Sequence, residues 1–462
     1  MERAVADLLL ELPDGHRVRP ALEDQLRTAI RRGQLRPGVR LPSSRALASQ
    51  LGVSRGVITE TYSQLIAEGY LLGKHGSGTT VASLDGRRRR STGATRSPSP
   101  GVLYDFHPGL PDLEQFPRMA WSRAVRKASE CMPTARLGYD DGAGAPELRD
   151  ELASFLGMSR GVRTEAGSVM ITAGFTQAFA LVCRALVRAG ARAIAIEDPG
   201  FFLTSAIAKD AGLDVLPVPV DDDGISVERL AETGADAVVV TPAHQAPTGV
   251  VLAPSRRSAL LDWAQSTKSL IIEDDYDAEF RYDRRPVGSL HGVSPDLVMY
   301  VGSASKVLAP ALRIGWAVLP ERMRGPMLRA KRLADGGCAI LEQLALAAFI
   351  GSGDFARHLH RMRRHYARRR RAFIDAVSSS LPDAEIRGIE AGLSALVLLR
   401  TDVNELSVIT DARDRGIRLA GLGEHYAHRR SARPGLVLGF AASHERRLEE
   451  GISLLASVVA SE

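Results

Sequence analysis

Residues 269–280, SLIIEDDYDAEF, and residues 300–316, YVGSASKVLAPALRIGW, each place polar side chains directly after a short apolar run. The first run ends in Asp274, Asp275 and Tyr276, and the second ends in two serines followed by Lys306 and, seven residues later, Arg313. Short apolar runs rich in β-branched residues predict buried strands. Because a buried carboxylate is costly without a cationic partner, both segments predict a polar site at one edge of a sheet.

Five further apolar runs alternate with helical segments in the region that follows residue 104. They are VMIT at 169–172, AIAIE at 193–197, DVLPVPV at 214–220, AVVVT at 237–241 and GWAVLP at 315–320. This alternation predicts an α/β fold with a mainly parallel sheet, whose ligands bind beyond the carboxyl ends of the strands. One strand end, ITAGFTQAF at 171–179, enters a helix through Gly174, Phe175 and Thr176, whose N–H groups can hold a phosphate.

The polar residues at these strand ends match the needs of pyridoxal 5′-phosphate. This cofactor requires a lysine for a Schiff base, a carboxylate for its pyridine nitrogen, a ring to stack on and donors for its phosphate. The chain has only six lysines, Lys74, Lys127, Lys209, Lys268, Lys306 and Lys331. Only Lys306 has the required setting, whereas Lys331 is expected to follow a basic helix.

The first 90 residues predict a DNA-binding unit. They hold 15 Arg or Lys and nine Asp or Glu, so they account for the whole formal charge of +6. Apolar spacing predicts a helix at 20–30, a second helix capped by Ser43 or Ser44, and a third after Ser54 with Val57, Ile58, Leu65 and Ile66 as buried candidates. The sequence YLLGKHGSGTTVA at 70–82 then predicts a β-wing. A basic helix-turn-helix with a wing is typical of DNA binding.

Residues 83–103, SLDGRRRRSTGATRSPSPGVL, combine four arginines with Ser, Thr, Gly and Pro. Such a composition cannot build a core and predicts a flexible tether. The arginines at 87–90 either add nonspecific phosphate attraction or serve only as spacing.

Composition excludes several other classes of protein. With 462 residues, 45% hydrophobic and 25% charged, the chain is neither disordered nor a coiled coil as a whole. Cys131, Cys183 and Cys338 are far apart and predict neither a disulfide framework nor a zinc or other metal site. No signal peptide or apolar run long enough to span a membrane is visible, so we expect a cytoplasmic protein.

Residues 33–81 resemble the GntR-type winged helix, in G-x-L-x-P-G, LPSSRxLAxxLGVSR and Y-x-x-L-x-x-E-G-Y-L. The resemblance implies that Arg45 holds a DNA phosphate and that the third helix faces the major groove. The wing would reach the backbone or minor groove. The implied contacts are Ser54, Arg55, Gly56 and Thr59 on the helix and Lys74 and His75 on the wing. At Gly56-Val57-Ile58 the chain departs from the family, which more often has Thr-Val at the second and third of these positions. This departure affects the base contacts implied for that turn, not the fold.

Residues 104–460 resemble a fold-type I aminotransferase domain, and the whole chain resembles the MocR family of transcriptional regulators. The motifs that carry this resemblance are IEDPGF at 196–201, TPAHQAPTG at 241–249, IEDDYDAEFRY at 272–282, RRPVGSL at 284–290 and SASKVLAPALRIGW at 303–316. The resemblance implies a winged helix at 16–82, a flexible basic linker at 83–103, and at 104–460 an aminotransferase-like domain with an α/β large part and an α+β small part.

The resemblance also implies the role of each residue toward pyridoxal 5′-phosphate. Lys306 would form the aldimine, Asp274 would pair with the pyridine nitrogen, Tyr276 would bond the O3′ oxygen and Phe201 would stack on the ring, unless it is a plain core aromatic. The phosphate would be held by Gly174, Phe175, Thr176, Ser303, Ser305 and Arg313, and by Tyr139 from a partner subunit. Asp275 is expected to be a solvated or salt-bridged neighbour.

The chain departs from the aminotransferase pattern at three places. Ala246 replaces the asparagine that usually contacts O3′, so His244 or Gln245 must supply that bond or it is absent. The segment YDDGAG at 139–144 lacks the usual proline. Val437 falls where an arginine binds a substrate carboxylate, and Arg433 is the nearest substitute.

Two functions follow from these features. In the first, the chain is a homodimeric regulator whose large domain binds pyridoxal phosphate, and an amino-compound effector or the cofactor itself alters how two winged helices meet DNA, each head lying near the partner's body. In the second, it is an active aminotransferase with an appended DNA-binding head. The missing carboxylate arginine favours the regulator, and the complete lysine site keeps transamination open.

Overall fold

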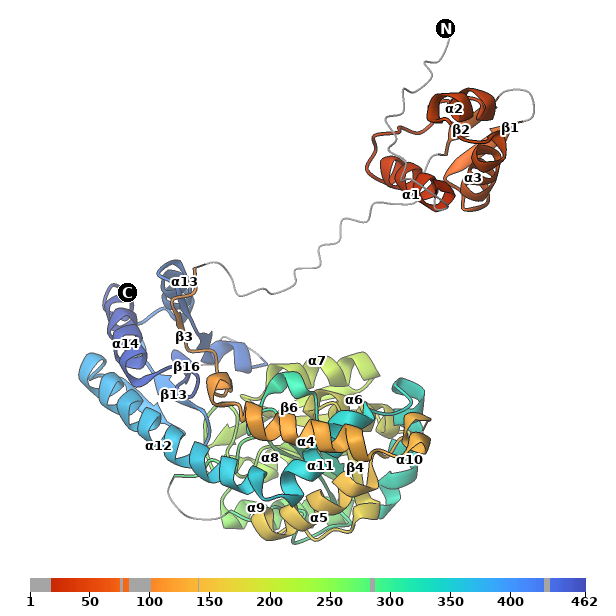
Figure 1. Ribbon diagram of the computed structural model, residues 1–462. Helices are drawn as coiled ribbons and strands as arrows, with labels where there is room; N and C mark the ends of the chain where they lie inside the picture. The colour runs from red at the N-terminus through yellow and green to blue at the C-terminus, as the bar shows by residue number, and fades with distance from the viewer. Residues whose placement is uncertain (1–17, 75–77, 83–100, 140, 283–286, 428–432) are drawn as a thin grey trace. The chain divides into compact units, whose positions relative to one another are not determined.

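Figure 1 shows a computed structural model of the chain, which describes residues 18–74, 78–82, 101–139, 141–282, 287–427 and 433–462. The chain divides into two units, Met1–Ser97 and Pro98–Glu462, and each is described by itself. Most of the predicted linker, residues 83–100, lies outside the described residues, as does His75 of the wing. No helix in the described ranges is long and apolar enough to cross a membrane.

The N-terminal unit is a three-helix bundle with a β-hairpin. It contains α1 (Val18–Arg31), α2 (Ser44–Leu51), α3 (Arg55–Ala67), β1 (Leu71–Lys74) and β2 (Gly78–Val81), with the two strands antiparallel. Ser43 caps α2 and Ser54 caps α3, each by accepting a backbone N–H with its side chain. The C-cap Gly52 has a φ of +67°, which permits the tight turn between these helices.

The core of this unit follows the predicted apolar spacing with two exceptions. Leu22, Leu26, Leu47, Ile58 and Leu65 are fully buried. The predictions that Val57 and Ile66 are buried were wrong, because Val57 is only half-buried and Ile66 is 38% exposed. In their place the third helix buries Thr61 and Tyr62, and the Tyr62 hydroxyl donates to the Pro42 carbonyl, which satisfies its polar end.

The second unit is built on an eight-stranded sheet in the order β4-β11-β10-β9-β8-β5-β6-β7. Its strands are β4 (Val169–Thr172), β5 (Ala193–Asp198), β6 (Asp214–Asp221), β7 (Gly224–Ile225), β8 (Ala237–Val240), β9 (Leu270–Asp275), β10 (Val298–Ser303) and β11 (Gly315–Val318). The central pairs are parallel, whereas β11 is antiparallel to β10 and to β4. The sheet is therefore mainly parallel, and the predicted fold class is confirmed.

Helices cover both faces of this sheet (Figure 1). One face packs on α6 (Phe175–Arg188), α7 (Phe202–Ala211) and α10 (Glu321–Ala334). The other packs on α4 (Arg118–Cys131), α5 (Pro146–Arg160), α8 (Val227–Thr233), α9 (Pro254–Thr267) and α11 (Ile340–Gly351). Both faces of the strands are therefore buried, which explains why the strands read as continuous apolar runs.

A smaller α+β part completes the unit. Its four-stranded antiparallel sheet has the order β12-β13-β16-β15, formed by β12 (Glu385–Arg387), β13 (Ser394–Leu398), β15 (Ala420–Gly421) and β16 (Gly435–Gly439). It packs on α12 (Asp354–Ser380), α13 (Glu405–Asp414) and α14 (Glu445–Val459). A short parallel pair joins β3 (Tyr104–Asp105) to β14 (Ile417–Arg418). The long α12 connects the small part to the large sheet.

Candidate functional site

The predicted site residues follow adjacent strands of the large sheet. β9 and β10 are parallel neighbours with Asp274 opposite Val301, so Asp274 and Ser303 lie toward the same edge. β4 ends at Thr172 and lies beside β11, and it delivers Gly174 to that edge as the residue before α6. The turn after β10 carries Lys306. The topology thus brings three separate sequence motifs to one end of the sheet.

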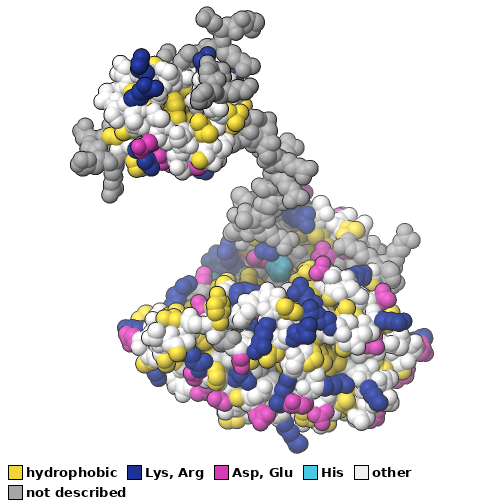
Figure 2. All heavy atoms as spheres, turned by 90° about the vertical axis from the view of Figure 1, so that its right-hand side faces the viewer, with side chains coloured by type: hydrophobic (Ala, Val, Ile, Leu, Met, Phe, Trp, Pro, Cys, Tyr) yellow, Lys and Arg dark blue, Asp and Glu magenta, His cyan; other side chains and the backbone are white. Residues whose placement is uncertain are grey.

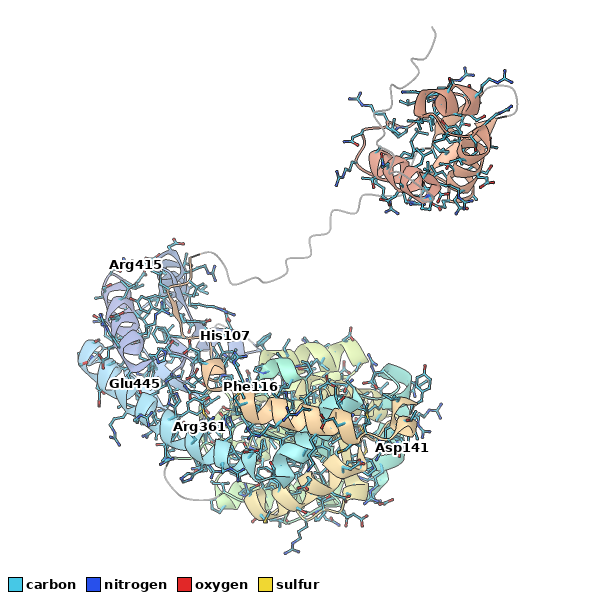
Figure 3. All side chains as sticks on the ribbon, viewed as in Figure 1. His107, Phe116, Asp141, Arg361, Arg415 and Glu445 are labelled. Carbon is cyan, nitrogen blue, oxygen red and sulfur yellow. The ribbon has the colours of Figure 1, made fainter. Side chains whose placement is uncertain are left out.

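Lys306 is largely buried, and its Nζ donates a 2.7 Å hydrogen bond to the carbonyl of Gly109. Gly109 belongs to the segment between β3 and α4, in which His107 is labelled in Figure 3. Burial lowers the pKa of Lys306, while the carboxylates of Asp277 and Asp274 partly oppose this shift. An amine with a lowered pKa is more readily available as a nucleophile, which is what a Schiff-base lysine requires.

Asp274 is a buried carboxylate that makes no hydrogen bond or ion pair with any residue in the described ranges. Its side chain is 8% exposed, and burial raises its pKa well above the usual value, assisted by Asp275 and Asp277 and opposed by Lys306. A carboxylate buried in this way needs a cation to neutralise it. A protonated pyridine nitrogen would supply that charge.

Asp275 was expected to be solvated or salt-bridged, and the structure shows the second alternative. Arg160 Nε lies 2.6 Å from its carboxylate and the Tyr300 hydroxyl donates to the same oxygen at 2.7 Å. All three side chains are buried. Because successive side chains of a strand point to opposite faces, Asp275 serves this ion pair while Asp274 stays free of it.

His244 and Tyr276 form a buried cluster with Asp277. The His244 Nδ1 lies 3.1 Å from Asp277 Oδ1 and 3.0 Å from the Tyr276 hydroxyl, and its Nε2 lies 3.2 Å from the carbonyl of Gly388. Burial disfavours the charged ring, but Asp277 outweighs it and the pKa of His244 is raised. Of the two residues expected to replace the missing asparagine, His244 therefore contacts Tyr276, the predicted O3′ ligand.

Gln245 contacts Pro199, Glu197 and Thr248 rather than Tyr276. Its Nε2 donates to the carbonyl of Pro199 at 2.8 Å and lies 3.3 Å from Glu197, while its Oε1 accepts from the Thr248 hydroxyl at 2.7 Å. Glu197 also accepts from the Thr241 hydroxyl at 2.6 Å. Burial raises the pKa of Glu197 to about 7 despite these hydrogen bonds. Gln245 thus fixes the loop at 245–248 against the end of β5.

The phosphate end of the predicted site combines a helix N-terminus with an unpaired cation. Gly174 precedes α6 with a φ of +102°, and a side chain there would come within 3.7 Å of the Arg313 guanidinium. Arg313 makes no hydrogen bond or ion pair with a residue in the described part of the chain. The N–H of Ser305 donates to Ser303 Oγ at 3.4 Å. Free N–H groups of Phe175 and Thr176 beside a guanidinium suit a phosphate.

These residues fit pyridoxal 5′-phosphate in the chemistry of their donor set. Asp274, an orphaned buried carboxylate, lies near the part-buried Lys306 amine, and Arg313, an orphaned guanidinium, lies beside Gly174 at the phosphate end. The cofactor carries the matching cation, anion and aldehyde in one molecule.

Two further predicted residues lie at the edge of this arrangement. Phe201 directly precedes α7, and its ring centre lies 6.2 Å from that of Phe175, in an edge contact. Tyr139 is fully exposed and makes no hydrogen bond or ring contact with a described residue. A cavity of about 510 Å³ borders the phosphate end and is lined by Thr172, Ala173 and Arg313, among others.

Arg433 lies away from these residues. Its Nη1 pairs with Glu385 at 2.8 Å and its Nε donates to the Leu399 carbonyl at 3.3 Å. It lines a second cavity of about 200 Å³, whose lining residues include none of the predicted cofactor ligands.

Sequence reasoning missed several buried ionisable residues. Arg160 lies in none of the quoted motifs, whereas Glu197 lies in IEDPGF and Asp277 in IEDDYDAEFRY, but neither was assigned a role. Lys331 does not follow a helix as expected but lies inside α10, fully buried, with its Nζ 2.9 Å from Asp335 and 3.2 Å from Cys338 Sγ. No cluster of His, Cys, Asp and Glu that could hold a metal ion is present within the described ranges.

The predicted DNA contacts lie at the surface of the N-terminal unit. Arg45, Ser54, Arg55, Gly56 and Thr59 are all exposed. Arg55 Nε donates to Ser44 Oγ at 3.4 Å, which joins the start of α3 to α2, and the Thr59 hydroxyl donates to the Arg55 carbonyl within α3 at 2.9 Å. Lys74 ends β1, and its side chain and His75 fall outside what the structure describes. Figure 2 shows Lys and Arg side chains at the surface of this unit, and basic and acidic side chains intermingled over the second.

Comparisons with known proteins agree with this two-part organisation. The family of bacterial regulatory proteins called gntR matches residues 20–81, and the aminotransferase class I and II family matches residues 111–417.

Two curated regulators are similar over nearly the whole chain. The pyridoxine biosynthesis transcriptional regulator PdxR of Corynebacterium glutamicum is 35% identical, over 92% of each chain. The probable rhizopine catabolism regulatory protein MocR of Rhizobium meliloti is 32% identical, over 94% of this chain and 92% of its own. Among solved structures, an archaeal alanine:glyoxylate aminotransferase has a TM-score of 0.71 and 26% identity, and the match covers 78% of this chain and 91% of that one.

Proposed function

This chain belongs to the MocR family of transcriptional regulators, with a gntR-family DNA-binding domain followed by an aminotransferase class I and II domain, and from this premise we propose that the second domain binds pyridoxal 5′-phosphate. The single observation that carries the proposal is the pair of unpartnered side chains, Asp274 near the part-buried Lys306 amine and Arg313 at the phosphate end. When bound, the cofactor supplies an aldehyde that can take up a primary amine.

In this proposal, each residue of the candidate site would have its own part in holding the cofactor. Lys306 would be its covalent anchor, Asp274 would keep the pyridine nitrogen protonated and Phe201 would cover the ring. Arg313, Ser303 and Ser305 would hold the phosphate, together with the N–H groups of Gly174, Phe175 and Thr176. Tyr276 would donate to O3′, and His244 would orient that hydroxyl through its contact at 3.0 Å.

The effector follows from the same chemistry. A site that holds an aldehyde responds either to the cofactor itself or to an amino compound that reacts with it. The name of the PdxR relative, which refers to pyridoxine biosynthesis, supports the cofactor as effector, and the name of the MocR relative, which refers to rhizopine catabolism, supports a small organic compound. Either ligand acts only through a difference in its affinity for two arrangements of the protein.

We further propose that the regulator acts as a cytoplasmic homodimer on double-stranded DNA. The fully exposed Tyr139, which has no contact with a described residue of its own chain, supports a role toward a partner subunit's phosphate site. Two winged helices on one dimer would bind two half-sites, and the linkage raises the effective concentration of the second head. Arg45, Arg55 and Thr59 would make the contacts with DNA, together with Ser54 and Gly56.

The experiment that tests the function is an electrophoretic mobility shift on the gene's own upstream region, with and without pyridoxal phosphate. We expect the cofactor, alone or with an amino compound, to change the affinity or the pattern of the shifted bands. The Lys306→Ala variant should lose both this response and the visible absorbance of the bound cofactor, while it keeps its nonspecific DNA affinity. Retention of that absorbance in Lys306→Ala would exclude the assigned site.

An active aminotransferase remains the second candidate, because the site retains a lysine, a carboxylate and phosphate donors. Sustained conversion of an amino donor and a 2-oxo acid over many turnovers, with DNA binding indifferent to the cofactor, would favour that alternative.

A further inference from the structure

A second cavity lies between the large sheet and the small part of the same unit. Its volume is about 200 Å³. The large part contributes the end of β6 and the loop at 248–250, and the small part contributes β12, β13 and the 3₁₀ helix Leu422–His425. Its polar lining includes Asp221, Asp222, Thr248, Arg387 and Arg433.

One side of this cavity is apolar. Leu396, Leu398 and Leu422 are buried and pack together in one cluster with Val437 and the half-buried ring of Tyr426. A hydrocarbon chain in the cavity would therefore contact leucine side chains and an aromatic ring, and would release ordered water from them.

Beside these leucines the cavity presents two half-exposed guanidinium groups, those of Arg433 and of Arg387, the cross-strand partner of Leu396. Glu385 bonds Arg387 Nε through one carboxylate oxygen at 2.6 Å and Arg433 Nη1 through the other at 2.8 Å. Arg387 Nη1 also pairs with Asp222 at 2.9 Å, and Arg433 Nε donates to the Leu399 carbonyl. The Nη2 of each arginine has no hydrogen-bond partner in the part of the chain that the structure describes. Glu385 and Asp222 offset the two positive charges, so an anion would be held by hydrogen bonds from the two Nη2 groups.

The cavity touches the cofactor site through two backbone routes. Arg387 is followed directly by Gly388, whose carbonyl lies 3.2 Å from His244 Nε2, and His244 in turn contacts Tyr276. The backbones of Gly388 and Gly249 are in close contact, since a side chain on Gly249 would come within 2.0 Å of the Gly388 Cα.

On the second route, Thr248 and Pro199 of the cavity wall are both bonded to Gln245. A ligand that moved β12 would therefore move the Gly388 carbonyl against His244, which contacts Tyr276, and one that moved the loop at 248–250 would move Gln245.

We propose that this cavity is a second ligand site, distinct from the pyridoxal site, for a short-chain aliphatic carboxylate. The carboxylate would bind the free Nη2 groups of Arg387 and Arg433, and the chain would lie on Leu396, Leu398 and Leu422. The volume of about 200 Å³ exceeds the roughly 150 Å³ of an apolar cavity that holds benzene, so it admits a chain of about five carbons. The coupling of this site to the cofactor rests on the function proposed above, whereas the binding itself does not.

The test is a calorimetric titration of the full-length protein with pentanoate, repeated with pentan-1-ol, which has the same chain and no carboxylate. We expect saturable binding of one pentanoate per chain in the cofactor-loaded protein and in Lys306→Ala, and none of the alcohol. Arg387→Gln and Arg433→Gln should each weaken the binding about tenfold. Arg446→Gln is the matched control, because Arg446 is an exposed arginine that pairs only with Glu450 among the described residues.

Three results would overturn the second site. They are the absence of saturable binding in the wild-type protein, loss of binding in Lys306→Ala, and an equal effect of Arg446→Gln and the two cavity variants. Thermal unfolding of each variant shows whether it is folded, and Arg433→Lys, which keeps the charge, should restore part of the affinity if Arg433→Gln has folded poorly. A wild-type protein that binds pentanoate but shows no cofactor absorbance would refute the proposed function while the cavity proposal stands.

The coupling between the second cavity and the cofactor site is tested by a separate measurement. Saturating pentanoate should shift the visible absorbance of the bound cofactor or change its dissociation constant at least twofold, and the change should be absent in Arg387→Gln. Binding without either change would refute the coupling.

Discussion

The imidazole of His244 and the carboxylate of Asp277 lie 3.1 Å apart in the buried wall of the candidate cofactor site. The same ring nitrogen contacts the Tyr276 hydroxyl, and the other nitrogen contacts the Gly388 carbonyl of the small part. Both nitrogens thus face oxygen atoms, which favours the doubly protonated ring. This explains how a buried histidine can have a raised pKa, since Asp277 balances its charge.

His244→Gln tests this pair. A group whose pKa is higher in the folded protein than in the unfolded one stabilises the fold at low pH. For His244 this stabilisation is complete below the ordinary histidine pKa of 6.5 and is lost as the pH rises through the pKa of the folded protein. We expect the variant without cofactor to be destabilised by about 1–3 kcal/mol at pH 6 and by less at pH 9, as measured by thermal unfolding at both pH values. Its affinity for pyridoxal phosphate should fall about tenfold, because Tyr276 loses its orienting contact.

His365→Gln is the matched control for that experiment. His365 Nε2 also pairs with an aspartate, Asp112, at 3.0 Å, but burial lowers the pKa of His365. Its substitution should therefore show the opposite trend, with a smaller loss at low pH than at high pH. The same pH dependence in both variants would contradict the explanation given for His244.

Arg313→Gln should separate phosphate binding from ring binding. Arg313 has a φ of +52°, so glutamine keeps the backbone cost similar while it removes the charge. We expect about a 100-fold loss of affinity for pyridoxal phosphate, from charge-assisted bonds worth about 1.5–3 kcal/mol each, and less than about a threefold change for pyridoxal, which lacks the phosphate. Arg184→Gln, an exposed change on the same helix as the phosphate-binding turn, should leave both affinities unchanged. Equal losses for the two ligands would show that Arg313 does not bind the phosphate.

The strand ends could be predicted from the sequence because the signal there is local. An apolar run followed by polar residues marks a buried strand and its ligand edge, so the residue pattern alone is enough to assign Asp274, Ser303 and Gly174 to one edge. The sheet order could not be read in this way, because β11 returns antiparallel between β10 and β4 and no residue type signals that direction.

Partners that lie far apart in the chain could not be predicted. Arg160 reaches Asp275 across 115 positions, and His244 reaches Gly388 across 144. No short motif links such pairs, and they depend on the packing of α5 on the sheet and of β12 against the loop at 248–250. The wrong assignment of Ile66 has a similar cause, since only the packing of α3 against α1 and α2 decides which of two neighbouring apolar residues is buried.

Arg55→Ala should reduce sequence-specific DNA binding selectively. Arg55 is exposed at the first position of α3, where a recognition helix presents side chains to base edges. Loss of one base contact costs about 1–3 kcal/mol, so we expect operator affinity to fall about 10- to 100-fold and nonspecific affinity to change by less than about threefold at the same salt concentration. Arg36→Ala, an exposed arginine with no predicted contact, is the control. A parallel loss on operator and random DNA would reassign Arg55 to the phosphate backbone.

Glu197→Gln should change the pH dependence of stability in the second unit. Burial raises the pKa of Glu197 from 4.5 to about 7, so the folded state favours the neutral acid. The free energy of unfolding therefore falls as the pH rises from 4.5 to 7, where the unfolded chain ionises before the folded one. Glutamine keeps an acceptor oxygen for Thr241 and Gln245 and never becomes charged.

The variant without cofactor should therefore unfold near the wild-type temperature at pH 5. At pH 8 it should be more stable, by about 3 kcal/mol at most at 1.36 kcal/mol per pKa unit. Glu232→Gln, which removes an exposed carboxylate paired with Arg229, should give the same small difference at both pH values. If Glu197→Gln behaved like Glu232→Gln, the Glu197 carboxyl would not be the group that titrates near neutral pH.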